Sequence, residues 1–215
     1  MPTYTLPLLA PLALLIGAAY AFANPGRRPG LAPLYAERTA LVAIGVAAFC
    51  TFKLITLGAA TGPTLGLFGL GVTPRLDALS ATMLLLVSFV GWVVLRYAAT
   101  YMDGEDRQGS FTGWLCVTLA AVLLLVQAGD LVHLVGSWIA ISIALRQLLL
   151  FYPDRVEARR AARKKGLSAA IGAIALTIAA VMLADGYGTT DIAAILDAAR
   201  AGNAPAGVIW AAALI

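Results

Sequence analysis

Charged residues are scarce in this chain: Asp, Glu, Lys and Arg together make up 12% of its 215 residues. A soluble domain carries about 25% charged residues, so this composition excludes a soluble fold. Hydrophobic residues make up 61% of the chain, and its mean hydropathy is +0.89. Both values are typical of a protein that lies in a lipid bilayer.

Residue types that bind metals and carry catalysis are also few. One histidine and two cysteines are present, so we predict no metal site and no pair of haem ligands. Cys50 and Cys116 lie inside apolar runs, where we expect them to be packing residues without a disulfide. A Walker loop, a dinucleotide-binding glycine pattern and a nucleophile elbow are all missing. We therefore expect neither a self-contained enzyme nor a cofactor.

No Lys or Arg precedes Arg27, although Ala21-Phe22-Ala23 resembles the end of a signal peptide. A signal peptide begins with a positively charged region, so a retained first membrane span is the better interpretation. The net charge of +4 does not indicate nucleic acid. The cations lie in short loops beside apolar spans, where membrane insertion and anionic lipid account for them.

Apolar runs long enough to cross a bilayer, about 20 residues each, recur along the chain. They predict six complete spans at about 6–23, 39–57, 77–101, 111–128, 131–152 and 166–184. A truncated seventh opens at Pro205 and stops at Ile215. We therefore expect an all-α, multi-pass transmembrane helix bundle. Residues 1–215 form a single membrane domain in this interpretation, the N-terminal part of a longer bundle.

Three shorter stretches connect or begin these spans. Glycine and proline dominate 58–75 and predict an extended surface loop or a short hairpin. The Asp77 carboxylate is well placed to cap the third span. Residues 191–201 carry apolar residues on one helical face, which predicts a helix at the membrane interface.

Lysine and arginine are distributed unevenly over the loops. The stretch 145–166 is densely basic between two spans, and such loops stay cytoplasmic. Alternation then puts eleven cations on the inner side: Arg27, Arg28, Arg38, Arg96, Arg107, Arg155, Arg159, Arg160, Arg163, Lys164 and Lys165. The outer side holds two, Arg75 and Arg200. We predict a bacterial cell inner membrane protein with its N-terminus outside and the Arg155–Lys165 loop in the cytoplasm.

Ionisable residues at membrane depth are candidates for an ion path, because a charge there is costly and seldom kept without a function. Arg146 lies seven residues before Pro153 and can line a polar path with Gln147. Its long stem can equally carry the charge to the headgroups. Lys53 lies five residues from Gly58 at the outer end of its span, which favours the second behaviour.

Asp130 and His133 are one helical turn apart at the outer start of the fifth span. They can form a proton-accepting pair, because histidine titrates near physiological pH. The alternative is a solvated helix start in which Asp130 is only the N-cap.

Three segments carry a family resemblance. Residues 76–83 read LDALSATM, residues 101–105 read YMDGE with Phe111 after them, and the third segment runs from LLLFYPDR at 148–155 to AARKK at 161–165. The first two resemble the antiporter-like membrane subunits of respiratory complex I and of cation/proton antiporters. The third looks closest to the DabB branch, the membrane subunits of DAB inorganic carbon accumulation complexes. The family is a bundle of more than a dozen helices.

The resemblance implies a transport function. Members of the DAB branch couple a proton or sodium gradient to capture of inorganic carbon, and a peripheral zinc-binding DabA-like subunit supplies the chemistry. Lys164 or Lys165 matches a family lysine and joins the ion-path candidates. The chain departs from the family where Ile139, in place of glutamate, follows Trp138, and where Ala170, Gly172 and Ala173 replace an arginine and a Gly-Asp pair. The family's channel lysine would lie beyond Ile215.

Two other functions stay open. The chain can be a subunit of a quinone-linked proton pump or cation/proton antiporter, or a truncated, non-conducting membrane scaffold. The basic segment has two interpretations as well: a surface for anionic membrane lipid or a docking site for the peripheral partner. Its residues are Arg155, Arg159, Arg160 and Arg163.

Overall fold

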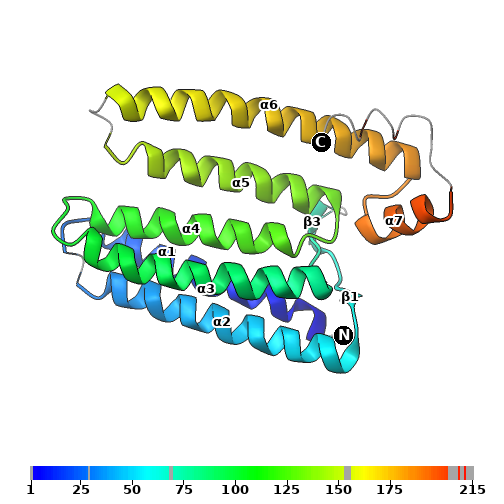
Figure 1. Ribbon diagram of the computed structural model, residues 1–215, viewed down its shortest axis with the longest axis horizontal. Coiled ribbons are helices and arrows are strands. Elements are labelled where there is room, and N and C mark those ends of the chain that lie inside the picture. Colours follow the sequence, from blue (N-terminus) through cyan, green and yellow to red (C-terminus); the bar gives the residue numbers. More distant parts are fainter. Residues whose placement is uncertain are drawn as a thin grey trace.

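The computed structural model describes residues 2–28, 30–67, 70–152, 156–202, 208 and 211. The chain begins with the 3-10 helix η1 (Pro2–Leu8). The α-helices are α1 (Leu9–Ala23), α2 (Ala32–Leu57), α3 (Ala78–Tyr101), α4 (Gln108–Val126), α5 (Leu131–Leu149), α6 (Val156–Tyr187) and α7 (Ile192–Arg200). Four short strands lie between α2 and α3: β1 (Ala60–Thr61), β2 (Leu65–Leu67), β3 (Leu70–Val72) and β4 (Arg75–Leu76). The long helices lie side by side with roughly aligned axes (Figure 1).

Six helices in the described part of the chain are long and apolar enough to cross a membrane. They are Thr5–Ala23, Ala32–Leu57, Ala78–Tyr101, Gln108–Val126, Leu131–Leu149 and Val156–Tyr187. This confirms the predicted all-α bundle of six complete spans. The predicted seventh span, 205–215, lies almost entirely outside the described residues and stays a prediction.

Two helices begin seven or more residues earlier than apolarity predicts. α2 begins at Ala32 and α6 at Val156, where the predicted spans begin at 39 and 166. Helical hydrogen bonds do not need apolar side chains, and alanine, glutamate, arginine and lysine are good helix formers. Pro33 also suits the first turn of α2. α5 ends at Leu149, three residues before the predicted limit.

Small side chains let the first four spans approach closely. α2 buries Ala36, Ala40, Ala43, Ala47 and Cys50 along one face, and it packs against α1 and α3. Small residues are favoured at helix contacts in membranes because packing, and not burial from water, holds such helices together. Cys50 and Cys116 are free thiols in this core, which confirms their predicted role in packing.

The described residues of 58–76 form a short hairpin, one of the two alternatives that glycine and proline predicted. β1 pairs with β4, and β2 pairs with β3, both antiparallel. Asp77 caps α3 as expected, since its carboxylate accepts a hydrogen bond from the Ser80 backbone N at 2.8 Å. The predicted interfacial helix is α7 (Ile192–Arg200), which Asp191 caps through the Ala193 backbone N at 2.7 Å.

The connections gather at two ends of the bundle (Figure 1). We call one the basic end: the connections 24–31 and 102–107, and the start of α6. The other is the hairpin end: strands β1–β4, the α4–α5 turn at 127–130, and α7. At the basic end the two connections are joined by ion pairs, Arg27 with Asp106 at 3.8 Å and Arg28 with Asp103 at 3.4 Å.

The start of α4 meets the connection 24–31 without a gap. A Cβ atom on Gly109 would lie 1.9 Å from the Asn24 carbonyl oxygen. Only glycine allows this approach, because the obstacle is backbone that cannot move aside. The contact joins α1 and α4, which pack against each other along their lengths.

Candidate functional site

A buried polar cluster lies at the hairpin end, where α5 begins. Asp130 caps the helix, since its Oδ1 accepts a hydrogen bond from the His133 backbone N at 2.7 Å. Its Oδ2 accepts a second hydrogen bond from the Thr73 hydroxyl. The cap is therefore as predicted, but the predicted solvated helix start is wrong. Asp130 is 6% exposed and His133 4%, because the hairpin folds over the start of α5.

The His133 ring is held by the same hairpin. Its Nδ1 lies 3.0 Å from the Thr73 carbonyl oxygen, which also accepts the Gly129 backbone N–H at 2.8 Å. A carbonyl oxygen only accepts hydrogen bonds, so Nδ1 carries the hydrogen in this contact. The other ring nitrogen, Nε2, is buried and has no hydrogen-bond partner among the described residues.

Thr73 completes the cluster, and buried Gln127 lies three residues before Asp130; the sequence did not single out either residue. Thr73 Oγ1 lies 2.9 Å from Thr64 Oγ1. The two hydroxyls therefore form a row that ends at the Asp130 carboxylate. Gln127, only 1% exposed, donates from Nε2 to the Leu123 carbonyl oxygen at 2.9 Å. Its Oε1 is buried without a partner in the described structure. A glutamine in the last turn of an apolar span is a signal that could have found it.

The nearest cation is already paired. Arg75 Nε lies 3.0 Å from Asp77 Oδ2. Burial raises the pKa of Asp77, but the hydrogen bonds from Ser80 and the Arg75 charge outweigh it and hold this pKa below its ordinary value. Asp130 takes part in none of the ion pairs between described residues. The cluster therefore holds an acid without a cation.

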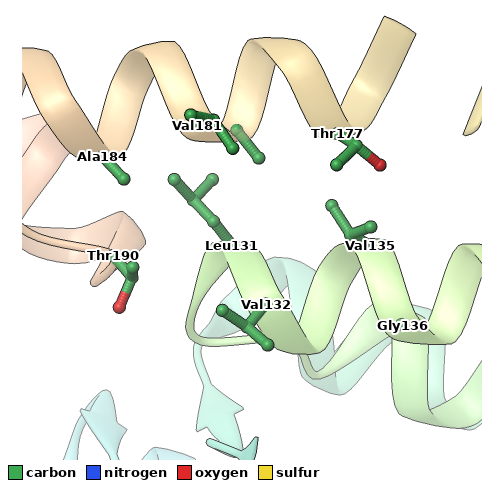
Figure 2. A pocket seen from close by; sticks show the side chains of 9 residues that line it. Leu131, Val132, Val135, Gly136, Thr177, Val181, Ala184 and Thr190 are labelled. Carbon is green, nitrogen blue, oxygen red and sulfur yellow. The ribbon is translucent and has the colours of Figure 1, made fainter. Parts of the chain in front are cut away.

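An apolar cavity of about 360 Å³ lies beside this cluster, between α5 and α6. Leu131 and Val135 face Val181 and Ala184 across it, with Thr177 and Thr190 at its edges (Figure 2). His133 is not among its lining residues. The polar cluster therefore does not open into this cavity.

A basic groove lies between α5 and α6 toward the basic end. One hollow of about 400 Å³ has Arg146, Arg163 and Ser142 in its wall, with Ile139 and Ala173 deeper along the helices. A neighbouring hollow of about 320 Å³ is lined by Arg146, Arg159 and Arg163. The structure thus brings the ion-path candidate Arg146 together with two residues predicted for docking. Arg146 is exposed in the last turn of α5, a position that suits either of its predicted roles.

The other predicted candidates lie apart from this groove. Lys53 is on α2, with its Nζ 5.6 Å from the centre of the Phe49 ring. α2 and α6 lie at opposite edges of the bundle (Figure 1). Arg160 and Lys164 are exposed on α6, and Lys165 is half-buried. Arg155 lies outside the described residues.

An ion pair between α2 and α3 was also missed. Arg96 Nη1 lies 2.8 Å from Glu37 Oε1, and the Arg96 guanidinium stacks 5.8 Å from the centre of the Trp92 ring. The predicted second span begins at residue 39 and therefore does not include Glu37. A helix that starts at Ala32 makes Glu37 part of the bundle.

Comparison with known proteins identifies relatives of this chain. Residues 64–112 match the sequence family described as the N-terminus of NADH-ubiquinone oxidoreductase (complex I) chain 5. A probable inorganic carbon transporter subunit DabB of Hydrogenovibrio crunogenus is 38% identical over 112 residues, 52% of this chain and 22% of the relative. The corresponding subunit DabB2 of Halothiobacillus neapolitanus is 33% identical over 199 residues, 87% of this chain and 35% of the relative. The chain thus spans about a third or less of these relatives.

Two solved structures share the fold. The membrane-bound sulfane sulfur reductase, an archaeal respiratory membrane complex, has a chain that superposes with a TM-score of 0.72 at 16% identity, over 99% of this chain and 42% of that one. A chain of the Mrp complex from Dietzia sp. DQ12-45-1b also gives 0.72, at 22% identity, over 95% of this chain and 22% of that one. Together with the sequence relatives, they confirm the predicted resemblance to antiporter-like membrane subunits.

Proposed function

The chain is a relative of the antiporter-like membrane subunits, and from this premise we propose that it works in an energy-coupled inorganic carbon uptake system. The observation that carries the proposal is the 33% identity with an inorganic carbon transporter subunit over 87% of the chain. In this role the chain is part of a membrane subunit that uses a proton or sodium gradient. Any chemistry is carried out by a partner subunit in this proposal.

The proposed partner is a peripheral, zinc-binding DabA-like subunit in the cytoplasm. The start of α6 is suited to receive it, because Arg159, Arg160 and Arg163 are exposed there on a helix at the edge of the bundle (Figure 1). Basic side chains at such a surface attract an acidic partner and speed its docking. This assignment takes the basic end as cytoplasmic, as the distribution of Lys and Arg predicts.

A subunit of a quinone-linked proton pump is the second candidate. The complex I chain 5 model, which matches residues 64–112, favours it. That region covers most of the hairpin and all of α3. The two candidates differ in what the complete complex does: one accumulates inorganic carbon, and the other moves electrons to quinone.

Uptake of labelled bicarbonate tests the proposal. The complete gene is expressed with the gene for its peripheral partner in bacteria that lack carbonic anhydrase. We expect cells with both genes to accumulate labelled inorganic carbon, and cells with either gene alone to accumulate none. A protonophore or a sodium ionophore should abolish the accumulation and identify the coupling ion. Absence of uptake together with quinone reduction dependent on this protein would support the second candidate.

A further inference from the structure

The Asp130 carboxylate is a buried charge without compensation. At 6% exposure it is removed from water, and hydrogen bonds from Thr73 and the His133 backbone are its only partners in the described structure. Burying a charge is costly unless an opposite charge stands beside it. With Asp130 ionised and the His133 ring neutral, the cluster has one negative charge in a buried site.

The ionisable groups of the surrounding elements do not supply the missing cation. In the hairpin, Arg75 is paired with Asp77. From the α7 side, Asp191 lies opposite Asp130 in a backbone bridge, and its carboxylate caps α7. Asp185 near the end of α6 is exposed, and Tyr187 beside it supplies no cation. α4 contributes Gln127, which is neutral as well. The basic residues of α6 lie in its first turns at the other end of the bundle, so the described acids near Asp130 that lack a cation are Asp185 and Asp191.

The His133 ring offers a position for one proton. Because its Nδ1–H donates to the Thr73 carbonyl oxygen, the neutral ring keeps its lone pair on Nε2. That lone pair is buried and accepts no hydrogen bond from any described residue. A proton bound there turns the imidazole into an imidazolium ion, which is a cation within one helical turn of Asp130. The pair then changes from a net charge of −1 to zero, without any bond to another atom being broken.

Hydroxyl groups connect the Asp130 carboxylate of the pair with the surface. Thr64 is exposed, its Oγ1 lies 2.9 Å from Thr73 Oγ1, and Thr73 donates to Asp130. A hydroxyl can accept one proton while it gives up another, so a row of hydroxyls can pass a proton along. We propose that Asp130 and His133 form a binding site for one proton, reached from the hairpin end through Thr64 and Thr73. The site does not depend on which substrate the complete protein carries.

The single histidine of the chain makes the proposal directly testable. Nitrogen-15 labelling of histidine followed by NMR in lipid reports the protonation of His133 alone, provided that the purification tag contains no histidine. Infrared difference spectra report whether Asp130 becomes a carboxylic acid. We expect the pair to take up one proton as the pH is lowered from about 8 to about 5. At the alkaline limit the spectrum should show the Nδ1–H form.

Asp130→Asn is the decisive variant, because asparagine still caps a helix but carries no charge. Proton affinity at the pair should fall at least about tenfold when the neighbouring charge is lost. Asp197→Asn, which removes an exposed acid on α7 at the same end, should leave the titration unchanged. Persistence of the Nδ1–H form in each variant shows that the hairpin contact has folded. If His133 stays neutral and Asp130 stays ionised throughout the range in the wild-type protein, the proposal is wrong.

Discussion

Thr73 is the residue on which the hairpin end depends most. Its hydroxyl contacts Asp130 and Thr64, and its carbonyl oxygen accepts hydrogen bonds from Gly129 and the His133 ring. It is 6% exposed, so water does not replace a hydrogen bond that is lost here. Leaving a buried polar group unpaired costs about 1–3 kcal/mol.

Replacement of Thr73 by valine should therefore destabilise the protein by about 1–3 kcal/mol. Valine keeps the shape of threonine and the backbone carbonyl, and it removes only the hydroxyl. The loss is measured as the shift of unfolding by denaturant in detergent, followed by circular dichroism. Thr73→Ser is the matched control, because it keeps the hydroxyl. An equal loss in both variants would assign the effect to packing and would refute the role of the hydrogen bond.

At the scale of elements, α4 and the connection 24–31 are held together by a contact that only glycine permits. Gly109→Ala places a Cβ against the Asn24 carbonyl oxygen, and such overpacking costs about 1–3 kcal/mol. Gly136→Ala in α5 meets nothing within 4 Å and should instead stabilise the helix by up to about 1 kcal/mol. The two thermal unfolding curves should move in opposite directions. A common direction would mean that the approach of α4 to this connection is looser than described.

The beginning of α6 is the element that we expect to hold the peripheral subunit. Reversing Arg159, Arg160 and Arg163 to glutamate should release the partner at moderate salt, because the charges that attract its acidic face are inverted. Co-purification from detergent extracts measures this. Substitution of the same three residues by lysine keeps the charge and should keep the partner. If the partner stays bound after the glutamate reversal, the segment binds lipid and serves only as a topological anchor.

Elements that depend on neighbouring residues could be predicted from the sequence, and contacts between distant residues could not. Asp77 and Asp130 were recognisable as caps, because a cap acts on backbone three residues away. Burial of Asp130 and His133 depends on Thr73, which is 57 and 60 residues distant along the chain. No local pattern contains that information. Glu37 was missed for another reason: apolarity marks the part of a helix in lipid, while the helix itself continues beyond it.

At the scale of the whole molecule, the polar groups of the two ends are far apart. His133 and Arg146 are thirteen residues apart on α5, which corresponds to about 20 Å of helix. Between them, the polar groups of α5 are the hydroxyls of Ser137 and Ser142 and the indole of Trp138. A proton path through hydrocarbon needs closely spaced polar groups or water. These residues by themselves do not provide such a path.

We therefore expect the chain alone, reconstituted in liposomes, to leave an imposed pH gradient intact. A pH-sensitive dye inside the liposomes measures the gradient, and empty liposomes provide the baseline. A leak that requires the protein and disappears in Arg146→Leu would contradict this expectation. It would make Arg146 part of a conducting path and would exclude its alternative role at the headgroups.

Orientation is the second prediction at this scale. Cysteine in place of Arg160, at the basic end, should react only with a reagent supplied from the cytoplasm, and cysteine in place of Thr190 only with one supplied from outside. Both positions are exposed. Cys50 and Cys116, which are buried, are first replaced by alanine to remove background labelling. Reversed labelling at both positions would invert the proposed topology.

The length of α6 has a geometric consequence for docking. Its 32 residues extend for about 48 Å, while the hydrocarbon core is about 30 Å thick. The helix length beyond the hydrocarbon core is close to the length of the basic segment. α6 therefore sets the height of the docking arginines above the bilayer and the direction around the helix axis in which they point. One residue inserted at Gly166 turns that direction by about 100° and raises it by about 1.5 Å. Seven inserted residues raise it by about 10 Å and nearly restore the direction, which separates the effect of height from that of angle.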